Sequence, residues 1–368
     1  MSRSGPVGVG VVGAGVISDT YLEHMTSFPD LQVLFIADLD QSRAAAQADR
    51  YDIAFHGSVD DMLAIDEIEI VVNLTVPSAH VDIDHRIIAA GKNVWSEKPL
   101  AMDRSSAAEL LAAARELGVR VACAPDTVLG SGIQSAMRAI ARGDIGEPLT
   151  ATTMFQVAGP EAWHPNPAFL YAAGAGPLLD MGPYYLTTLV HAFGPVARVS
   201  AVSSRSHAER TIGNGPRQGE RFPVSVPTHY GALVSFESGR SAQTTFSFQS
   251  ALPRMGMVEI SGTEGTLVLP DPNTFEGDSQ LWRFGQEAPE SVRATGSAYG
   301  RGAGVVDLGR AIRGGKTETA SGTLAAHVLD VLLTIADSAE RAKSVAVKST
   351  APKPTPLPES WDPTERTW

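Results

Sequence analysis

The stretch Val7–Ser18, VGVGVVGAGVIS, decides the fold. Its apolar start is typical of a buried parallel strand. It ends in Gly13-x-Gly15-x-x-Ser18, with serine at the third position of a glycine-rich turn, and a helical pattern follows. Glycine is needed where a backbone turns tightly and where a diphosphate touches it, and the N–H groups of the next helix can bind that anion. The stretch therefore predicts a dinucleotide site, with cofactor contacts at Gly13, Gly15, Val16 and Ile17.

An acidic residue, Asp38, ends the next strand-like run, Leu31–Asp38. An acid about 20 residues beyond the glycines accepts hydrogen bonds from the adenosine ribose in dinucleotide sites, and its charge repels a 2′-phosphate. This favours NAD over NADP. Two alternatives stay open. In the first, Asp38 caps the next helix instead, although Asp40 is also a candidate for that cap. In the second, Arg43 weakens the preference for NAD, so that NADP is also accepted.

Strand-like runs alternate with helical patterns through the first third of the chain. Further apolar runs lie at 68–75, 92–96 and 120–124, and helical patterns at 16–28, 40–50, 78–90 and 103–117. Such alternation predicts a doubly wound α/β domain, in which helices cover both faces of a parallel sheet.

The pattern changes after about residue 126. One helix near 130–142 is followed mainly by strand-like segments, and a helix returns near 323–340; the strand-like segments are 196–205, 228–237, 240–250, 256–262 and 265–269. Alternating polar and apolar residues predict a mainly antiparallel sheet with one solvated face. We expect a Rossmann domain at 1–125, an α+β substrate and oligomerisation domain at 126–345, and an extended proline-rich tail at 346–368.

Composition narrows the class of protein. The 368 residues suggest two domains, and the formal net charge of −12 argues against binding to nucleic acid or an anionic membrane. The single cysteine, Cys123, excludes an intramolecular disulfide and is expected in the core. No leader, no apolar run near 18 residues and no metal-ligand spacing stands out, so we expect a soluble cytoplasmic protein without a metal site.

Four motifs together resemble one known family. Gly13-x-Gly15, TVPSAH (Thr75–His80), Glu97-Lys98-Pro99 and GAGPLLDMGPYYL (Gly174–Leu186) occur in that order. The chain resembles the glucose–fructose oxidoreductase / inositol dehydrogenase / MocA (Gfo/Idh/MocA) family over about residues 5–345. The resemblance implies a Rossmann domain, an open-faced sheet domain often used in oligomerisation, and NAD(P)-linked chemistry on a sugar, polyol or related hydroxyl compound. We therefore expect a homodimer or homotetramer.

The resemblance makes Lys98 the active-site lysine, near the nicotinamide and the reacting hydroxyl. A lysine taken alone is usually a solvated surface residue, but this one follows a strand whose carboxyl end faces the ligand crevice of a doubly wound sheet. A cation there stabilises a developing alkoxide. Glu97 is expected to orient Lys98 or the cofactor amide, and Pro99 to fix the backbone, with a cis bond as one way of doing so.

The Thr75–His80 motif borders the nicotinamide half of the cofactor in this resemblance. It places Thr75, Pro77 and His80 among the cofactor-binding residues, together with Glu97 and Lys98. The alternative for His80 is a position in the first turn of the next helix without a chemical role.

The last motif departs from the family pattern Asp-x-Gly-x-His, because Tyr184 replaces the histidine that is the presumed acid–base. A phenol can accept a proton when a nearby cation such as Lys98 stabilises the phenolate. The alternatives are that Tyr184 only binds substrate and that Lys98 takes the proton. Asp180 is expected to bind the sugar or hold Lys98, unless it is structural, and Thr187 or Thr188 lies on the same helical face. His191 is a weaker candidate, two turns beyond Tyr184.

The loop EAWHPNPAFLY (Glu161–Tyr171) supplies two more substrate contacts. Trp163 offers an apolar face to a sugar ring and His164 a polar tip, and loop residues on a rigid scaffold often contact ligand. The alternative is a hydrophobic plug that holds the loop.

These motifs predict an NAD-dependent dehydrogenase or reductase that acts on a secondary hydroxyl of a small carbohydrate or polyol. Two other classes stay open. One is an enzyme that cleaves glycosides by transient oxidation without net redox change, and the other is a regulatory protein that binds the cofactor but has no activity.

Overall fold

The computed structural model describes residues 5–368, which separate into two compact units. The first unit contains the described chain up to Ser131 together with Thr295–Ala326 and Leu357–Trp368, and the second contains Gly132–Ala294 and His327–Pro356. The sequence pattern assigns 295–326 to the second domain and 346–368 to an extended tail, whereas the packing groups 295–326 and 357–368 with the N-terminal unit.

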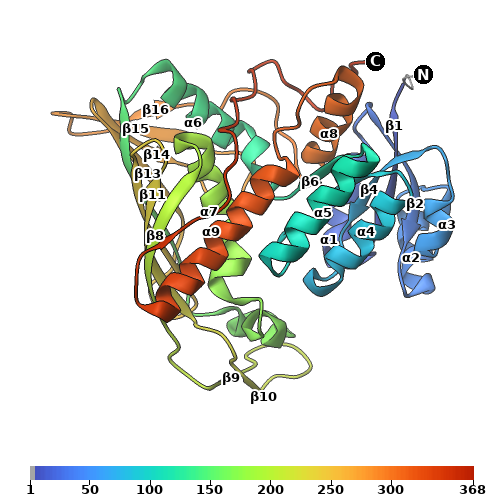
Figure 1. The fold of residues 1–368 in the computed structure, drawn as a ribbon, viewed down its shortest axis with the longest axis horizontal. Coiled ribbons are helices and arrows are strands. Elements are labelled where there is room, and N and C mark those ends of the chain that lie inside the picture. The colour runs from blue at the N-terminus through green and yellow to red at the C-terminus, as the bar shows by residue number, and fades with distance from the viewer. Residues whose placement is uncertain (1–4) are drawn as a thin grey trace. The chain divides into compact units, whose positions relative to one another are not determined.

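The first unit is built on a six-stranded parallel sheet in the order β3-β2-β1-β4-β5-β6 (Figure 1). Its strands are β1 (Val7–Val12), β2 (Leu31–Ala37), β3 (Phe55–Gly57), β4 (Ile68–Asn73), β5 (Asn93–Ser96) and β6 (Val121–Cys123). The order reverses between β1 and β4, and such a reversal creates a crevice at the carboxyl ends of the strands. This confirms the predicted doubly wound domain, although the short β3 was not predicted.

Helices cover both faces of this sheet. On one face lie α1 (Val16–Met25), α2 (Gln41–Arg50) and α8 (Ala303–Gly314), which share one apolar core with β1. On the other lie α3 (Val59–Leu63), α4 (His80–Ala89) and α5 (Arg104–Leu117). Both layers pack closely: a Cβ on Gly304 of α8 would lie 1.9 Å from the Trp95 ring, and one on Gly10 would lie 2.5 Å from Met62 Sδ of α3.

The end of the chain packs against the first unit. The buried carboxylate of Asp30 accepts hydrogen bonds from Thr367 N (2.9 Å), Thr367 Oγ1 (2.7 Å) and Arg310 Nε (2.8 Å). The Arg310 guanidinium also lies 5.4 Å from the centre of the Trp361 ring. The segment Leu357–Trp368 has no helix or strand, as expected of a proline-rich tail, but it is held in place.

The second unit contains a nine-stranded sheet in the order β16-β15-β14-β13-β7-β12-β11-β8-β17. Every neighbouring pair is antiparallel except β7 and β12. The strands are β7 (Pro148–Gln156), β8 (Val196–Ser204), β11 (His229–Phe236), β12 (Ser241–Ser247), β13 (Arg254–Gly262), β14 (Gly265–Leu269), β15 (Ser279–Arg283), β16 (Glu290–Val292) and β17 (Val345–Ala346). A separate hairpin pairs β9 (Glu209–Thr211) with β10 (Arg221–Pro223).

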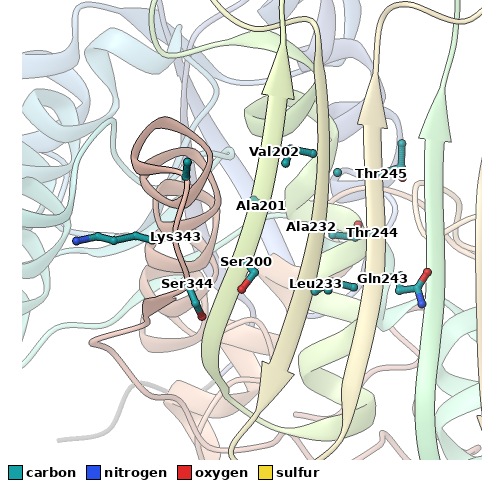
Figure 2. Close-up of a pocket in the computed structure, with 12 residues that line it drawn as sticks. Ser200, Ala201, Val202, Ala232, Leu233, Gln243, Thr244, Thr245, Lys343 and Ser344 are labelled. Atoms are coloured by element: carbon teal, nitrogen blue, oxygen red, sulfur yellow. The ribbon is translucent and has the colours of Figure 1, made fainter.

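One face of the large sheet is covered and the other is open. Helix α7 (Gly176–Phe193) packs on β7, β11 and β12. On the opposite face Ser200, Leu233 and Gln243 lie directly across from one another on three strands, in a shallow hollow of about 650 Å³ (Figure 2). Leu233 is 58% exposed and Val202 is 67% exposed. The predicted open-faced sheet is therefore confirmed.

Two further long helices are α6 (Ser131–Arg142) and α9 (Gly322–Arg341). By length and composition α9 could cross a membrane, with a mean hydropathy of 1.2, but 61% of its apolar window is buried in the protein, as in the core helix of a soluble protein. The sequence reading missed this apolar run.

Candidate active site

The glycine-rich turn leaves backbone accessible at the end of β1. Gly13 has φ of +99°, and a Cβ on it would lie 2.8 Å from the Leu74 carbonyl, so both conformation and space require glycine. Around Gly15 a Cβ would meet nothing within 4 Å. Gly15 is also the N-cap of α1 without a side-chain hydrogen bond, and Val16 beside it is 93% exposed. This open helix N-terminus fits the diphosphate of a dinucleotide.

The carboxylate of Asp38 contacts this turn directly. Its Oδ2 accepts a hydrogen bond from Ala14 N (2.7 Å) and its Oδ1 accepts one from Asp40 N (2.8 Å). The cap of α2 is Asp40, whose side chain accepts from Ser42 N and Arg43 N. Asp40, and not Asp38, is therefore the residue that caps α2. Each oxygen of Asp38 can accept a further hydrogen bond, as ribose hydroxyls require.

A buried polar chain follows β4. Thr75 donates from its N (3.1 Å) and Oγ1 (2.6 Å) to Asn73 Oδ1, and Asn73 Nδ2 donates to Asp84 Oδ1 (2.8 Å). Burial raises the pKa of Asp84 to about 7. Sequence reasoning did not select Asp84, because an acid in an amphipathic helix is ordinarily a surface residue. Pro77 lies in the short helix η1 (Pro77–Ala79) and is exposed.

His80 is buried between two turns. It has no exposed surface, and its Nδ1 lies 2.8 Å from Pro99 O while its Nε2 lies 3.0 Å from Thr75 O. The imidazole therefore links the turn after β4 to the turn after β5. The contacts of Thr75, Pro77 and His80 with the cofactor stay predictions.

The Glu97-Lys98-Pro99 turn follows β5, and the Lys98–Pro99 peptide bond is cis, which is one way for Pro99 to fix the backbone. Glu97 Oε2 accepts a hydrogen bond from Lys98 N (2.9 Å), and Glu97 Oε1 accepts one from Tyr21 Oη (2.8 Å). Glu97 is buried and Lys98 is half-buried. The carboxylate thus holds the backbone of the lysine.

Sequence reasoning missed two residues beside Glu97. Arg301 Nη1 lies 3.9 Å from Glu97 Oε1 and 3.6 Å from Asp126 Oδ1. Asp126 is fully buried, its Oδ2 accepts hydrogen bonds from Gly302 N and Gly304 N, and burial raises its pKa to about 6. No motif marks Arg301, which lies in a glycine-rich segment just over 200 positions after the turn that it faces.

In the second unit, α7 carries the Asp-x-Gly-x-Tyr motif. Asp180 is half-buried, while Tyr184 is 5% exposed and Thr187 is 4% exposed. Thr188 Oγ1 donates to Tyr184 O (2.9 Å), so that hydroxyl satisfies the helix backbone. Gly182 is required by packing, because a Cβ on it would lie 2.3 Å from Leu332.

His191 of α7 is a packed residue. It is 2% exposed, and within residues 5–368 neither ring nitrogen has a hydrogen-bond partner. Burial lowers the pKa of His191 to about 3, so the ring is neutral near pH 7. An uncharged, enclosed imidazole is a poor candidate for proton transfer with a substrate.

Trp163 and His164 of the second unit lie in the loop between η3 (Pro160–Ala162) and η4 (Pro167–Tyr171). Trp163 is 63% exposed, which does not fit a hydrophobic plug. The His164 ring lies 5.5 Å from that of Trp163 and 5.4 Å from that of Phe169, between centroids. Its Nδ1 accepts a hydrogen bond from Asn166 N. Substrate contact by this loop stays a prediction.

The site residues thus form two groups, one in each unit. Thr75, His80, Glu97 and Lys98 are linked at the carboxyl ends of β4 and β5, and Asp180, Tyr184 and Thr187 lie along α7. Among the described residues no group of three His, Cys, Asp or Glu side chains could hold a metal ion. Cys123 is buried and unoxidised, and burial raises its thiol pKa.

Known protein families match both units. Residues 7–124 match the NAD-binding Rossmann-fold domain of an oxidoreductase family, and residues 133–268 match the GFO/IDH/MocA C-terminal domain. The fold also matches the crystal structure of an NAD-binding oxidoreductase from Klebsiella pneumoniae, with 26% identity and a TM-score of 0.80 over 94% of this chain and 100% of that one.

The match with each of three relatives covers about three quarters of that relative's length. An uncharacterized oxidoreductase from Rhizobium meliloti is 31% identical over 72% of this chain and 74% of its own. A trans-1,2-dihydrobenzene-1,2-diol dehydrogenase from Bos taurus is 26% identical over 72% and 74%. A 1,5-anhydro-D-fructose reductase from Ensifer adhaerens is 28% identical over 70% and 74%. The chain belongs to the Gfo/Idh/MocA family of NAD-binding oxidoreductases.

Proposed function

We propose that this enzyme transfers hydride between NAD and a secondary hydroxyl of a cyclic sugar, polyol or sugar derivative. The observation that carries the proposal is the Lys98 turn, because Glu97 holds the backbone of a half-buried lysine at the carboxyl edge of a dinucleotide-binding sheet. A cation held at this edge is suited to stabilise negative charge on a substrate oxygen.

The substrate class is supported by α7 and by the relatives. Asp180, Tyr184 and Thr187 supply a carboxylate, a phenol and a hydroxyl on one helix, which suits a ligand with many hydroxyl groups. Two relatives are named for a cyclic vicinal diol and an anhydro sugar, both of which carry neighbouring oxygens on a ring. Trp163 and His164 are proposed as additional substrate contacts.

Each residue has a separate role in the proposal. Bound NAD supplies a hydride acceptor, and the open turn at Gly13 and Gly15 with the carboxylate of Asp38 holds it. Lys98 stabilises the substrate oxygen as an alkoxide develops, and Tyr184 accepts the hydroxyl proton. Asp180 accepts a hydrogen bond from a neighbouring hydroxyl. If Lys98 accepts the proton itself, Tyr184 serves as a substrate contact.

The experiment is a fluorescence screen for NADH with purified protein, NAD and a panel of sugars, inositols, anhydro sugars and sugar acids. Lys98→Ala is the test variant, and Lys316→Ala, an exposed lysine of the same unit, is the matched control. We expect NADH with one group of substrates, lost only in Lys98→Ala. Cleavage of a glycoside without NADH, or tight NAD binding without any turnover, would contradict the proposal in favour of the two other classes.

The open sheet face is proposed to pair with a second copy of the chain, as a dimer or as part of a tetramer, in a cytoplasmic enzyme. Leu233 on β11 and Val202 on β8 expose apolar surface on this face, and exposed apolar patches of this kind mark interfaces. Leu233→Asp should lower the mass found by light scattering, while Leu117→Asp, an exposed leucine at the end of α5, should not. A monomeric wild-type protein would contradict this.

A further inference from the structure

Both ring nitrogens of His80 face backbone carbonyl oxygens. Nδ1 lies 2.8 Å from Pro99 O and Nε2 lies 3.0 Å from Thr75 O. A carbonyl oxygen only accepts hydrogen bonds, and a neutral imidazole carries a single N–H. Both contacts are hydrogen bonds only when both nitrogens carry a proton, that is, when His80 is an imidazolium.

The neutral ring fits this environment poorly. One nitrogen lone pair would then point at a carbonyl oxygen at about hydrogen-bond distance, where the two groups repel each other. His80 has no exposed surface, so water does not reach the ring to relieve that contact. A buried polar atom without a partner costs about 1–3 kcal/mol.

We propose that His80 is an imidazolium that ties the Thr75 turn to the Lys98–Pro99 turn and so positions Lys98 for the reaction. This inference rests on the proposed function for its kinetic consequence, but not for the state of the ring. His80 is then a positioning residue, since both of its nitrogens are already used by the protein.

Charged and titratable groups lie on the elements next to His80. On its own helix, Asp84 lies one turn further on, and Asn73 Nδ2 donates to both Asp84 Oδ1 (2.8 Å) and His80 O (3.2 Å). Asp84, whose pKa burial raises to about 7, is thereby held beside the first turn of α4, where its ionised form would offset a cation that the helix dipole opposes. Exposed Asp82 adds negative charge to that turn. On the β5 side, Glu97 and Lys98 belong to the turn that His80 contacts through Pro99 O, while Asn73 and Thr75 on the β4 side are neutral.

Loss of the two His80 contacts should affect catalysis through the position of Lys98. Thr75 belongs to the turn that follows β4, and Pro99 is bonded to Lys98. Loss of the double contact allows the two turns to move apart, which displaces Lys98 without removing any group that holds the cofactor diphosphate. A misplacement of about 1 Å costs on the order of 100-fold in rate. The loss is therefore expected in kcat, with the dissociation constant for NAD unchanged.

The state of the ring is tested by NMR on the full chain labelled with ¹⁵N-histidine. Long-range ¹⁵N–¹H correlation distinguishes an imidazolium from either neutral tautomer, and at pH 7.5 exposed histidines are mostly neutral. We expect one of the nine histidines to have both nitrogens protonated and its signals to be absent from His80→Gln. If that variant does not fold, the signals are assigned by elimination with variants of the other eight. A neutral tautomer at His80 overturns the proposal.

The positioning role is tested by kinetics on the substrate that the NADH screen identifies. His80→Gln can keep one hydrogen bond but not two donors in the ring geometry, and His85→Gln, half-exposed on the same helix, is the matched control. We expect kcat to fall about 100-fold in His80→Gln alone, with the NAD dissociation constant unchanged. A raised dissociation constant with unchanged kcat would show direct cofactor contact and overturn the proposal. Should the screen find no substrate, the proposed function fails while the NMR result still decides the state of His80.

Discussion

The hydroxyl of Tyr21 donates a hydrogen bond of 2.8 Å to Glu97 Oε1, although 76 positions separate the two residues. Tyr21 lies on α1, the helix that begins at the glycine-rich turn, and Glu97 holds Lys98 N through its other oxygen. Burial, reinforced by the charge of Glu97, raises the pKa of Tyr21 far above its usual value, so the hydroxyl stays a donor. One contact thus joins the helix that follows the glycine-rich turn to the turn that carries the proposed catalytic lysine.

Replacement of Tyr21 by phenylalanine should lower both the stability of the protein and kcat. The change leaves Glu97 Oε1 without its hydroxyl donor, and an unsatisfied buried group costs about 1–3 kcal/mol. We expect a loss of unfolding free energy in that range and a fall of about tenfold in kcat, because the Lys98 turn is less firmly held. Urea unfolding and steady-state kinetics measure the two effects.

Tyr51→Phe is the matched control. The Tyr51 hydroxyl donates to Asp19 Oδ1 (3.1 Å) in the same unit but does not contact the Lys98 turn. It should lose some stability and keep its kcat. Equal kcat values in the two variants would show that the Tyr21 hydrogen bond has no role in positioning Lys98.

Arg301→Gln should destabilise the protein more at pH 8 than at pH 5. Arg301 Nη1 lies 3.6 Å from Asp126 Oδ1, and its charge lowers the pKa of that buried carboxyl, which burial raises to about 6. Without Arg301 the pKa of Asp126 rises further, so a charged carboxylate is left unpaired at pH 8 and is protonated at pH 5. Breaking a buried pair costs about 3–5 kcal/mol.

The double variant Arg301→Gln, Asp126→Asn decides whether that penalty comes from the unpaired charge. The amide removes the charge and can still accept a hydrogen bond from Gly302 N. Its urea midpoint at pH 8 should lie above that of Arg301→Gln alone. If the double variant is the less stable of the two, the arginine acts by packing instead of by charge.

The stability of the first unit should depend on pH through the ionisation of Asp307. Burial raises the pKa of this α8 carboxyl from 3.8 to about 6. The folded state therefore holds the proton more tightly than the unfolded state, and stability is lost as pH rises from about 4 to about 6. Two pKa units correspond to about 3 kcal/mol. Asp307→Asn cannot ionise, so its unfolding free energy relative to wild type should rise by about that amount between pH 3.5 and pH 7. A constant difference across this range would contradict the shifted pKa.

Local patterns were sufficient to predict the doubly wound sheet and the two turns of the first unit. Gly13 and the Lys98 turn are encoded within a few residues of the strands that they follow, so their chemistry can be read from neighbouring positions. α8 could not be assigned in this way, because its packing against Trp95 joins positions about 200 apart. Arg301 and Asp126 could not be identified from the sequence for the same reason, because a single charged residue forms no recognisable pattern until the fold brings it next to its partner.

Cofactor choice is expected to depend on the charge of Asp38. Its carboxylate holds Ala14 N and Asp40 N and still has lone pairs for ribose hydroxyls, while its charge repels a 2′-phosphate. Asp38→Asn can still accept from Ala14 N but loses the charge. Hydrogen bonds to a charged group contribute about 1.5–3 kcal/mol, so the ratio of kcat/KM for NAD to that for NADP should fall about 10- to 100-fold. Asp40→Asn, at the N-cap of α2, should leave the ratio unchanged. A wild-type enzyme that uses both cofactors equally, or an Asp38→Asn variant with the wild-type ratio, would show that another residue recognises the ribose.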